Sequence, residues 1–465
     1  MLLQTKLLNQ LADAGKRVAI IAPDIEDVNL QALAEQSGVE LYAAPVANSL
    51  WNEDYLYKRK YYLEDIKANP ALWEKHMYSL WYSKSKHPWR RVRPLYYLLI
   101  HRLIKLFPSI RKRFLSSEKR YLQSATITDL LHKIQPRLVV ATYPVNILEA
   151  QVLYAARTAG IHTLLHLLSW DNITSKGRFP VLADEYIVWG EIMEAELQEY
   201  YQTPRQYIHR CGVPHFDYYE QYRNGEAHTE ELAQMGLQPD APYLFFAMSA
   251  ERFTPHEIDI VEQLARAVRD NTFGPDVQLI IRPHPQVVQG NLTRSGWRQR
   301  LEQLVGDRVA VDWPRLLKSG LRWSLQQQDM HHLAALLAGC SLCLNSGSTI
   351  SIEAQLLDKP VILTSFDAGY QLPYWKSARR LIDYTHLKKL IALGGISVAR
   401  DQQQLETLIG RYLDDPSWQR AERQRASYQQ CYERDGQATQ RVKAAVINIL
   451  NDLEQKEQPA PVVKI

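Results

Sequence analysis

The segment Ser341–Thr364 reads SLCLNSGSTISIEAQLLDKPVILT and decides the fold class. Its apolar run Ser341–Leu344 predicts a buried strand, and the polar loop Asn345–Thr349 follows it. A helix that starts near Ser348 then leads to a second predicted strand over Pro360–Thr364. Alternation of strand and helix indicates an α/β domain built on a parallel sheet.

The same alternation extends through the rest of the chain. Further strands are predicted around this segment and in the first half, with a turn-rich junction at Asp217–Pro242 and helices from about 402 to 452. The predicted strands are Arg137–Thr142, Ile161–Leu168, Glu185–Trp189, Gln206–Val213, Tyr243–Met248, Val277–Arg282 and Arg308–Asp312.

We therefore predict two Rossmann-like domains that face a cleft. The first covers residues 1–215 and carries a basic helical insertion at about 50–125. The second covers 216–452, and a disordered tail is predicted at 453–465.

The chain opens on a predicted helix, Leu2–Ala14, ahead of the strand Arg17–Pro23. An α/β domain normally begins with a strand that leads into its first helix. The sequence therefore predicts that the first N-terminal strand is missing, as after a truncation or a misplaced start.

The composition excludes several classes of protein. The 465 residues include 55 Lys and Arg against 51 Asp and Glu, so the chain is not basic throughout. Four cysteines without a leader-like start favour a reducing compartment. Since no uncharged apolar run approaches the roughly 18 residues of a membrane span, a cytoplasmic protein is expected.

The loop Asn345–Thr349 is a candidate binding site for a diphosphate. Ser346, Gly347, Ser348 and Thr349 offer hydroxyl and backbone N–H donors at the start of a helix, where the macrodipole favours an anion. Glu353 follows Thr349 by one turn and could accept hydrogen bonds from ribose hydroxyls. The alternative is an ordinary helix cap followed by an acidic residue in the first turn.

Two other loops are expected at the same edge of the second sheet. Arg282-Pro283-His284-Pro285 ends one strand, and Ser249-Ala250-Glu251-Arg252 follows another. Ligands collect outside the carboxyl ends of parallel strands, so Arg282, His284, Ser249 and Arg252 are predicted to face a bound nucleotide. A plain turn around His284 and a solvated Arg252 are the alternatives.

Three further stretches complete a recognisable series. They are Ser169–Gly177 (SWDNITSKG), Tyr186–Glu191 (YIVWGE) and Cys211–Asp217 (CGVPHFD), ahead of the Arg-Pro-His-Pro loop and of the Asn-Ser-Gly-Ser-Thr loop with Glu353 and Pro360. Over about residues 135–365 the chain resembles the GT-B glycosyltransferases of bacterial surface-carbohydrate synthesis, near the CDP-glycerol glycerophosphotransferases. The resemblance implies a nucleotide donor on the C-terminal half and a saccharide or lipid-linked acceptor on the N-terminal half.

The chain also departs from that family. The glycerophosphotransferases usually carry an Asp close to a Ser-Ser element, whereas this loop reads Asn-Ser-Gly-Ser-Thr, which favours a nucleotide-sugar donor over CDP-glycerol. Polyol-phosphate transfer from a CDP-alcohol and a non-catalytic scaffold subunit of an envelope assembly remain as alternatives. A hydrolysing sugar 2-epimerase would need further acidic residues that the sequence does not place.

A basic segment lies between Lys84 and Arg120, with 12 Lys or Arg and the single acidic residue Glu118. Within it, a helix between Pro94 and Pro108 is predicted to carry His101, Arg102 and Lys105 as a polar stripe. The apolar stripe beside it is predicted at Tyr96, Leu99, Leu103 and Leu106. The segment fits an anionic membrane surface on the inner face of the cell membrane, or packing of its apolar side on the domain. No nucleic-acid-binding module accompanies these charges.

These observations predict a glycosyltransferase that needs neither metal nor cofactor. The sequence has no Asp-x-Asp, and the Cys340–Cys343 pair lies within a predicted strand. His284 is predicted to stabilise the departing diphosphate, and Asp171 is predicted to act as the general base. For Asp171 the alternative is a carboxylate that stabilises a turn.

Overall fold

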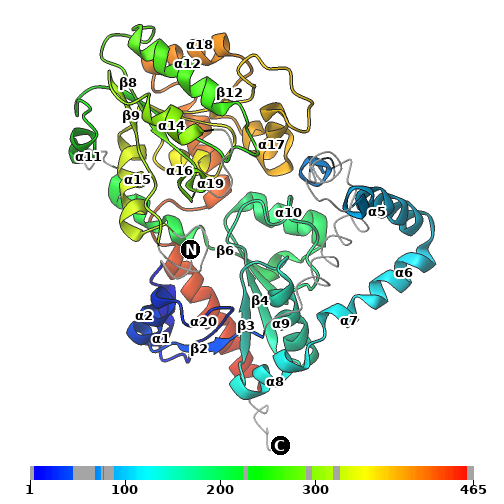
Figure 1. Ribbon diagram of the computed structural model, residues 1–465. Coiled ribbons are helices and arrows are strands. Elements are labelled where there is room, and N and C mark those ends of the chain that lie inside the picture. Colours follow the sequence, from blue (N-terminus) through cyan, green and yellow to red (C-terminus); the bar gives the residue numbers. More distant parts are fainter. Residues whose placement is uncertain are drawn as a thin grey trace, which may run out of the picture. The chain divides into compact units, whose positions relative to one another are not determined.

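A computed structural model describes residues 5–45, 69–74, 77, 88–223, 229–289, 296–317 and 325–457. The chain forms two compact units (Figure 1). Unit 1 comprises Met1–Asp217 and Cys431–Ile465, and unit 2 comprises Tyr218–Gln430.

Unit 2 is built on a six-stranded parallel sheet in the order β12-β11-β10-β7-β8-β9. Numbered from its own first strand, this is the doubly wound order 3-2-1-4-5-6, in which the chain reverses direction across the sheet between β7 and β10. The strands are β7 (Tyr243–Ala247), β8 (Gln278–Arg282), β9 (Val309–Val311), β10 (Leu342–Asn345), β11 (Val361–Thr364) and β12 (Ile396–Ala399).

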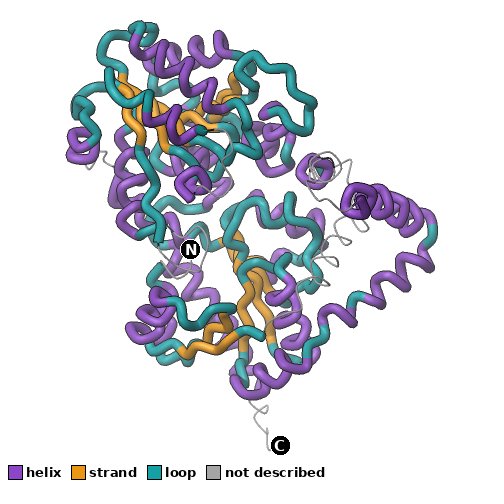
Figure 2. The backbone as a smooth tube through the Cα atoms, in the orientation of Figure 1, coloured by secondary structure: helices purple, strands orange, loops and turns teal. Residues whose placement is uncertain are grey.

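Helices connect these strands and cover the sheet (Figure 2). Every residue of β7, β8, β10 and β11 is buried, as expected for a parallel sheet covered on both faces. The helical segments are α11 (Thr229–Gln234), α12 (Glu257–Arg269), α13 (Pro285–Gln289), α14 (Trp297–Glu302), α15 (Gln327–Gly339), α16 (Ile350–Leu356), η5 (Ala378–Asp383), α17 (Thr385–Ala392), α18 (Gln402–Asp414) and α19 (Arg420–Cys431).

Unit 1 contains a four-stranded parallel sheet in the order β3-β4-β5-β6 and a separate parallel pair, β1-β2. The strands are β1 (Ala19–Ala22), β2 (Glu40–Ala43), β3 (Leu138–Ala141), β4 (His162–His166), β5 (Glu185–Val188) and β6 (Ile208–Arg210). The helical segments are α1 (Leu7–Asp13), α2 (Val28–Ser37), α5 (Pro88–Leu106), α6 (Pro108–Ser117), α7 (Lys119–Leu122), α8 (Ala125–Ile134), α9 (Ile147–Thr158), α10 (Glu191–Tyr201), η2 (Arg205–Tyr207) and α20 (Ala438–Glu457). The segment η3 (Pro214–Tyr222) begins in unit 1 and ends in unit 2.

The parallel α/β architecture confirms the predicted fold class, but the last helix belongs to a different unit from the one predicted. Val442, Val446 and Ile449 of α20 share an apolar cluster with Leu7 and Leu11 of α1 in unit 1. The tail was predicted to start at residue 453, yet α20 continues to Glu457, and 458–465 lie outside the described residues. This return cannot be predicted from the sequence, because an amphipathic helix does not specify which sheet its apolar face covers.

Two contacts fix α20 where the chain returns to unit 1. Asp217 accepts hydrogen bonds from the backbone N–H groups of Ala438 and Thr439 at 2.8 and 2.7 Å. Gly212 has a φ of 82°, and a Cβ there would lie 3.0 Å from the carbonyl oxygen of Cys431 and 3.1 Å from Cβ of Ala438. Glycine is therefore needed at 212 both for the backbone conformation and for the close approach.

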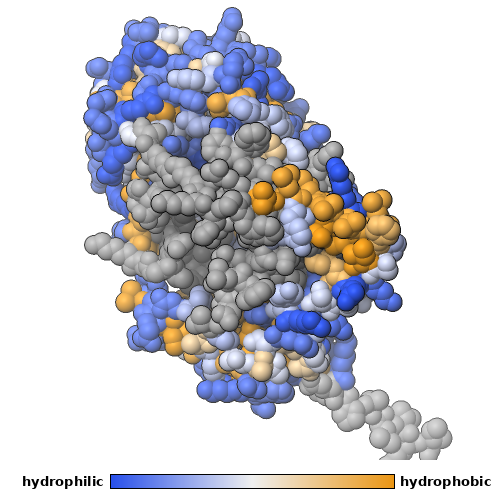
Figure 3. All heavy atoms as spheres, turned by 45° about the vertical axis from the view of Figure 1, so that its right-hand side comes forward, coloured by the Kyte–Doolittle hydropathy of each residue, from blue (hydrophilic) through white to orange (hydrophobic). Residues whose placement is uncertain are grey.

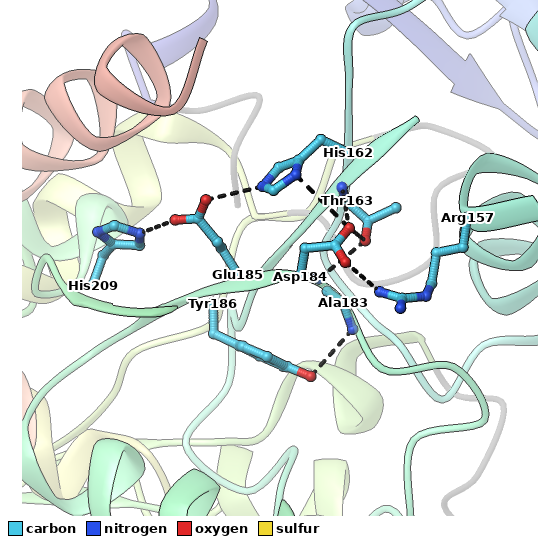
Figure 4. A network of polar contacts seen from close by, with 8 residues as sticks. All are labelled: Arg157, His162, Thr163, Ala183, Asp184, Glu185, Tyr186 and His209. Carbon is cyan, nitrogen blue, oxygen red and sulfur yellow. Dashed lines mark hydrogen bonds and ion pairs between the residues drawn. The ribbon is translucent and has the colours of Figure 1, made fainter. Parts of the chain in front are cut away.

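A polar network joins β4, β5 and β6 near the start of β5 (Figure 4). Glu185 contacts His162 Nε2 at 2.9 Å and His209 Nε2 at 2.5 Å, while Asp184 accepts from Arg157 at 2.6 Å and from the Thr163 hydroxyl at 2.6 Å. Burial raises the pKa of both carboxyls, but their hydrogen bonds outweigh burial and leave both pKa values lowered. The network therefore contributes to stability while the carboxylates stay ionised.

We predict that Glu185→Gln lowers the free energy of unfolding by about 1–2 kcal/mol at pH 7, because both histidine contacts lose a charged acceptor. The folded pKa of Glu185 lies below its unfolded value of 4.5, so this contribution is present above that pH and is lost as the pH falls through the folded pKa. Urea unfolding of both proteins at a series of pH values measures the difference. Glu35→Gln, at an exposed position of α2, is the control. An equal loss in the control would contradict the assignment.

Candidate functional site

The candidate site lies at the carboxyl ends of β7 and β10, the neighbouring central strands of unit 2. In a doubly wound sheet the loops after these two strands leave in opposite directions, and ligands bind in the crevice between them. Ser249 follows β7, and Ser346 follows β10. The structure thus brings together two of the loops that the sequence singled out.

A buried carboxylate, Glu257, joins these loops. The backbone N–H of Ser249 donates to its Oε2 at 2.6 Å, and the Ser346 hydroxyl donates to its Oε1. The same hydroxyl lies 2.7 Å from Thr364 Oγ1 at the end of β11. Burial raises the pKa of Glu257 to about 7, against the opposing effect of its hydrogen bonds. Glu257 is therefore the group that holds the site together.

The Asn345–Thr349 loop is stabilised from within. Asn345 Oδ1 accepts from the N–H groups of Gly347 and Ser348 at 2.8 and 2.9 Å and from the Ser351 hydroxyl at 3.0 Å. Two backbone donors predicted to bind a diphosphate are thus already used. Gly347 has a φ of 103°, and a Cβ there would lie 2.8 Å from Cδ1 of Leu387. The loop therefore needs glycine at 347 both for its positive φ and for the contact with Leu387, and its hydroxyl groups are what it can present to a ligand.

Glu353 lies on α16, one turn beyond this loop, as predicted. The hydroxyl of buried Tyr219 donates to its Oε2. Burial raises the pKa of Glu353, against the effects of Tyr219 and of the positive charge of Arg282. Tyr219 stacks on Tyr218 with ring centroids 4.6 Å apart. The carboxyl group is thus fixed in place through one oxygen, Oε2.

Arg282, which the sequence predicts to face a bound nucleotide, lies at the end of β8. It is buried, and its guanidinium forms ion pairs with Asp312 and Asp329. Asp312 also contacts His332 Nε2 at 3.1 Å. Burial of the guanidinium acts to lower its pKa, but the two carboxylates outweigh it and raise it. Arg282 therefore fixes the end of β8 to the loop that follows β9 and to α15.

His284 and Arg252 lie close to each other at the same edge. Burial, reinforced by the charge of Arg252, lowers the pKa of His284 to about 4, so its ring is neutral at pH 7. His284 Nδ1 accepts from the Gln286 N–H at 3.1 Å, which places the ring proton on Nε2. Arg252 is exposed, with its guanidinium 4.3 Å from the centroid of the Phe253 ring. This edge of the sheet thus carries a neutral imidazole beside a cation.

Asp171 lies in unit 1, in the turn that follows β4. Its carboxylate accepts from the Ser169 and Ser175 hydroxyls at 2.6 and 2.9 Å, and Lys176 Nζ lies 2.8 Å away. Because both oxygens are used, the structure favours the turn-stabilising role over that of a general base.

Sequence reasoning missed the residues that hold the site together. Glu257 resembles any acidic residue in the first turn of a helix, and Asp312 and Asp329 lie far from Arg282 along the chain. These acidic residues stand out only because they are buried, and the sequence around one residue does not show whether its side chain is buried. Asn345 lies within the loop singled out from the sequence. Asparagine is a preferred helix-capping residue, and this preference could have indicated its role.

No residues of the described ranges form a group of three or more His, Cys, Asp or Glu that could hold a metal ion. The four cysteines are buried, and none of them forms a disulfide. Among the described helices, none is both long and apolar enough to cross a bilayer.

No protein-family model matches the sequence, and no curated protein matches it. Among solved structures, the chain is similar to the UDP-GlcNAc 2-epimerase from Neisseria meningitidis bound to UDP-GlcNAc, with 12% identity, a TM-score of 0.52 and 96% of each chain covered. A second UDP-N-acetylglucosamine 2-epimerase gives 14% identity and a TM-score of 0.51 over 98% of this chain and 95% of that one. A glycosyltransferase from Rickettsia africae gives 10% identity and a TM-score of 0.48, with 97% and 93% covered. The likeness to the two epimerases shows that this chain has an α/β fold of GT-B type.

We predict that raising the pH from 4.5 to 8 lowers the free energy of unfolding of the wild-type protein more than that of Glu257→Gln. The expected difference is roughly 3 kcal/mol. The folded pKa of about 7 exceeds the unfolded value of 4.5, so the folded state holds its proton longer and loses stability as the pH rises through that window. Glutamine imitates the protonated carboxyl and does not titrate. Urea unfolding across the window measures the difference, with exposed Glu302→Gln as the control. Parallel curves for wild type and Glu257→Gln would show that the carboxyl titrates normally.

Proposed function

We propose that this protein is a glycosyltransferase that moves a sugar from a nucleotide-sugar donor to an acceptor hydroxyl. The observation that carries the proposal is the pair of loops at the β7–β10 switch point, joined by Glu257. A nucleotide is the ligand that this position in a doubly wound sheet commonly binds. The two epimerases of similar fold act on a UDP-sugar, which supports the same ligand class here.

In the proposed complex Glu353 binds the ribose. Its Oε2 is fixed by Tyr219, which leaves Oε1 to accept hydrogen bonds from ribose hydroxyls. The diphosphate then lies near the hydroxyls of Ser348 and Thr349, with the Arg252 cation and the neutral ring of His284 beside them. Gly347 keeps the loop in this conformation, because its φ is positive and Leu387 fills the space that a Cβ would take.

The reaction needs little from the protein beyond positioning and charge. An acceptor oxygen forms a bond to the anomeric carbon while the bond from that carbon to the diphosphate oxygen breaks. The electron pair of the broken bond goes to the diphosphate, and the acceptor proton passes to a base. Arg252 and His284 would stabilise the charge that develops on the leaving group. Envelope polysaccharide synthesis is the process we propose for it, with CDP-alcohol transfer as the alternative.

We also propose that α5 and α6 attach the protein to an anionic membrane. On α5 the side chains of Val92, Leu95, Tyr96, Leu99 and Leu106 are exposed, and no residue of α6 is buried. Figure 3 shows apolar side chains gathered on the side of the molecule that carries α5 and α6. Exposed basic residues accompany them: Arg102, Lys105, Arg111, Lys112 and Arg113. An apolar face with adjoining cations is typical of a helix that lies in the headgroup region.

Two details of this segment differ from the prediction. α5 begins at Pro88 rather than Pro94, and a second helix starts at Pro108. His101, predicted in the polar stripe, is buried like Tyr97 and Ile104, because these three positions share one face of α5, and Tyr97 and Ile104 form an apolar cluster with Leu72. The buried face therefore lies opposite the apolar face that stays exposed, while Lys84 and Lys86 fall outside the described residues.

We predict that Glu353→Ala weakens nucleotide-sugar binding at least tenfold, because the ribose loses its acceptor. Calorimetry with UDP-, CDP- and GDP-sugars measures the affinity, with Glu302→Ala as the control on exposed surface. Tyr219→Phe should show a smaller loss, since it frees Oε2 without removing the carboxylate. Equal affinity in wild type and Glu353→Ala would remove Glu353 from the site.

The reaction class is decided by incubating wild type with the preferred nucleotide-sugar. A glycosyltransferase releases nucleoside diphosphate rapidly only when a saccharide acceptor is added. Inversion at C2 of the sugar without an acceptor would identify an epimerase, and absence of nucleotide binding would favour a scaffold protein.

We predict that wild type co-sediments with phosphatidylglycerol vesicles and that Leu95→Glu/Leu99→Glu reduces this binding at least tenfold. Two carboxylates would have to enter the headgroup region in place of two leucines. Val305→Glu, at another exposed apolar position, is the matched control. Binding that is equal in the double variant, or equal on uncharged phosphatidylcholine vesicles, would contradict the proposed surface.

A further inference from the structure

The strands of unit 1 form two separate sheets, and each sheet has an open edge toward the other. Among the described strands, β1 pairs with β2 alone and β3 pairs with β4 alone (Figure 2). The second side of β1 and that of β3 therefore carry backbone N–H and C=O groups that no described strand uses. An open strand edge of this kind is a ready template for a further strand.

The open edges of β1 and β3 lie close together. The Glu454 carboxylate of α20 lies 3.7 Å from Lys16 Nζ, shortly ahead of β1, and 3.1 Å from Arg137, directly ahead of β3. Val18 and Leu138 also pack against one apolar cluster, formed mainly by α1 and α20. The same helices thus cover both sheets, and the amino ends of β1 and β3 meet. The two strands nevertheless do not pair with each other.

Unit 2 indicates what fits between them. In its doubly wound order, 3-2-1-4-5-6, the first strand lies between the second and the fourth. In unit 1 the order would be the same if β1 and β2 were the second and third strands and β3 were the fourth. The space between the open edges of β1 and β3, here called the strand slot, is then the central position of the sheet. Neighbouring strands lie about 4.8 Å apart, so the slot suits a single strand.

The side chains of β1 and β3 are those of central strands. β1 reads Ala-Ile-Ile-Ala and β3 reads Leu-Val-Val-Ala, whereas the outer strands β2 and β6 carry Glu40 and Arg210. Charges on an edge strand discourage further pairing, and β1 and β3 lack them. Every residue of β1 is only partly buried, and Val140 of β3 is 45% exposed, although the central strands β7 and β10 of unit 2 are buried throughout. A strand in the slot would bury these side chains.

The amino end of the slot is basic. Arg17 donates to the carbonyl oxygen of Ile134 at the end of α8, which brings that helix end to the same place. The basic residues around this end are Lys16, Arg17, Lys133 and Arg137, and the carboxylates bonded to them are Glu40 and Glu454. The excess of positive charge among these residues favours acidic residues in whatever enters the slot at this end.

We propose that the strand slot binds an extended segment of a partner polypeptide as a central strand, parallel to β1 and β3. The segment carries four apolar residues, matching the length of β1 and β3, with acidic residues directly ahead of them. β-Branched residues suit it best, because they fit a pleated, buried surface. Main-chain hydrogen bonds to both edges supply the affinity, and the apolar and acidic side chains supply the specificity. This interaction is independent of the proposed function.

The test uses the full chain and a fluorescent synthetic peptide, Glu-Glu-Val-Ile-Val-Val-Ser. Anisotropy measures its affinity, and hydrogen–deuterium exchange locates it. We expect saturable binding with slower exchange in the segments 18–22 and 138–141. A peptide with proline in place of isoleucine should bind at least tenfold more weakly, because proline lacks the N–H that a central strand needs. Lys-Lys in place of Glu-Glu should weaken binding at least threefold.

Val140→Asp is the main variant of the protein. It should leave the melting temperature nearly unchanged, since Val140 is exposed, but lower peptide affinity at least tenfold, since the bound strand would bury the new carboxylate. Val305→Asp, at an exposed apolar position of unit 2, is the matched control and should bind the peptide as wild type does. Arg137→Gln should reduce the preference for Glu-Glu over Lys-Lys.

Four results would overturn the proposal. They are no saturable binding of the acidic peptide, slower exchange at the outer strands β2 or β6 instead of β1 and β3, equal affinity in Val140→Asp and wild type, and a rise in melting temperature only when the same segment is fused ahead of Met1. The last would assign the slot to a strand of the chain itself and not to a partner.

Discussion

The candidate site depends on one interaction, the contact of a single buried carboxylate with the loops after β7 and β10. Glu257 accepts from the Ser249 backbone and the Ser346 hydroxyl, so the loops cannot separate without leaving buried polar groups unpaired. The doubly wound strand order places those loops on neighbouring strands. The sheet topology thus places the loops after β7 and β10 next to each other, and Glu257 holds them at a fixed separation.

The other buried charges are paired in the same way. Arg282 is held between Asp312 and Asp329 beneath the loop that carries His284, so the loop begins from a rigid point. The groups left toward solvent or ligand are Arg252, one oxygen of Glu353 and the loop hydroxyls. Rigid support beneath a few accessible polar groups is what a binding site on a scaffold requires.

The sequence was sufficient for the fold class and for the position of the site. Continuous apolar strands such as Tyr243–Met248, each followed by a helix, can hardly form anything except a buried parallel sheet. Local sequence also placed Ser346 and Ser249 at strand ends. It could not assign α20 to unit 1, because the apolar face of a helix does not specify which sheet it packs against. Nor could it show Arg282 as an internal ion pair, since its partners lie 30 and 47 residues away along the chain.

We propose that a nucleotide-sugar binds at the β7–β10 switch point of unit 2. Hydrogen–deuterium exchange of the full chain, with and without the nucleotide-sugar that binds most tightly, tests it directly. We expect slower exchange in the segments 249–257 and 345–353, with little change at the carboxyl edge of the unit 1 sheet until an acceptor is added. Slower exchange confined to unit 1, or unchanged exchange in both segments at saturating ligand, would contradict the claim.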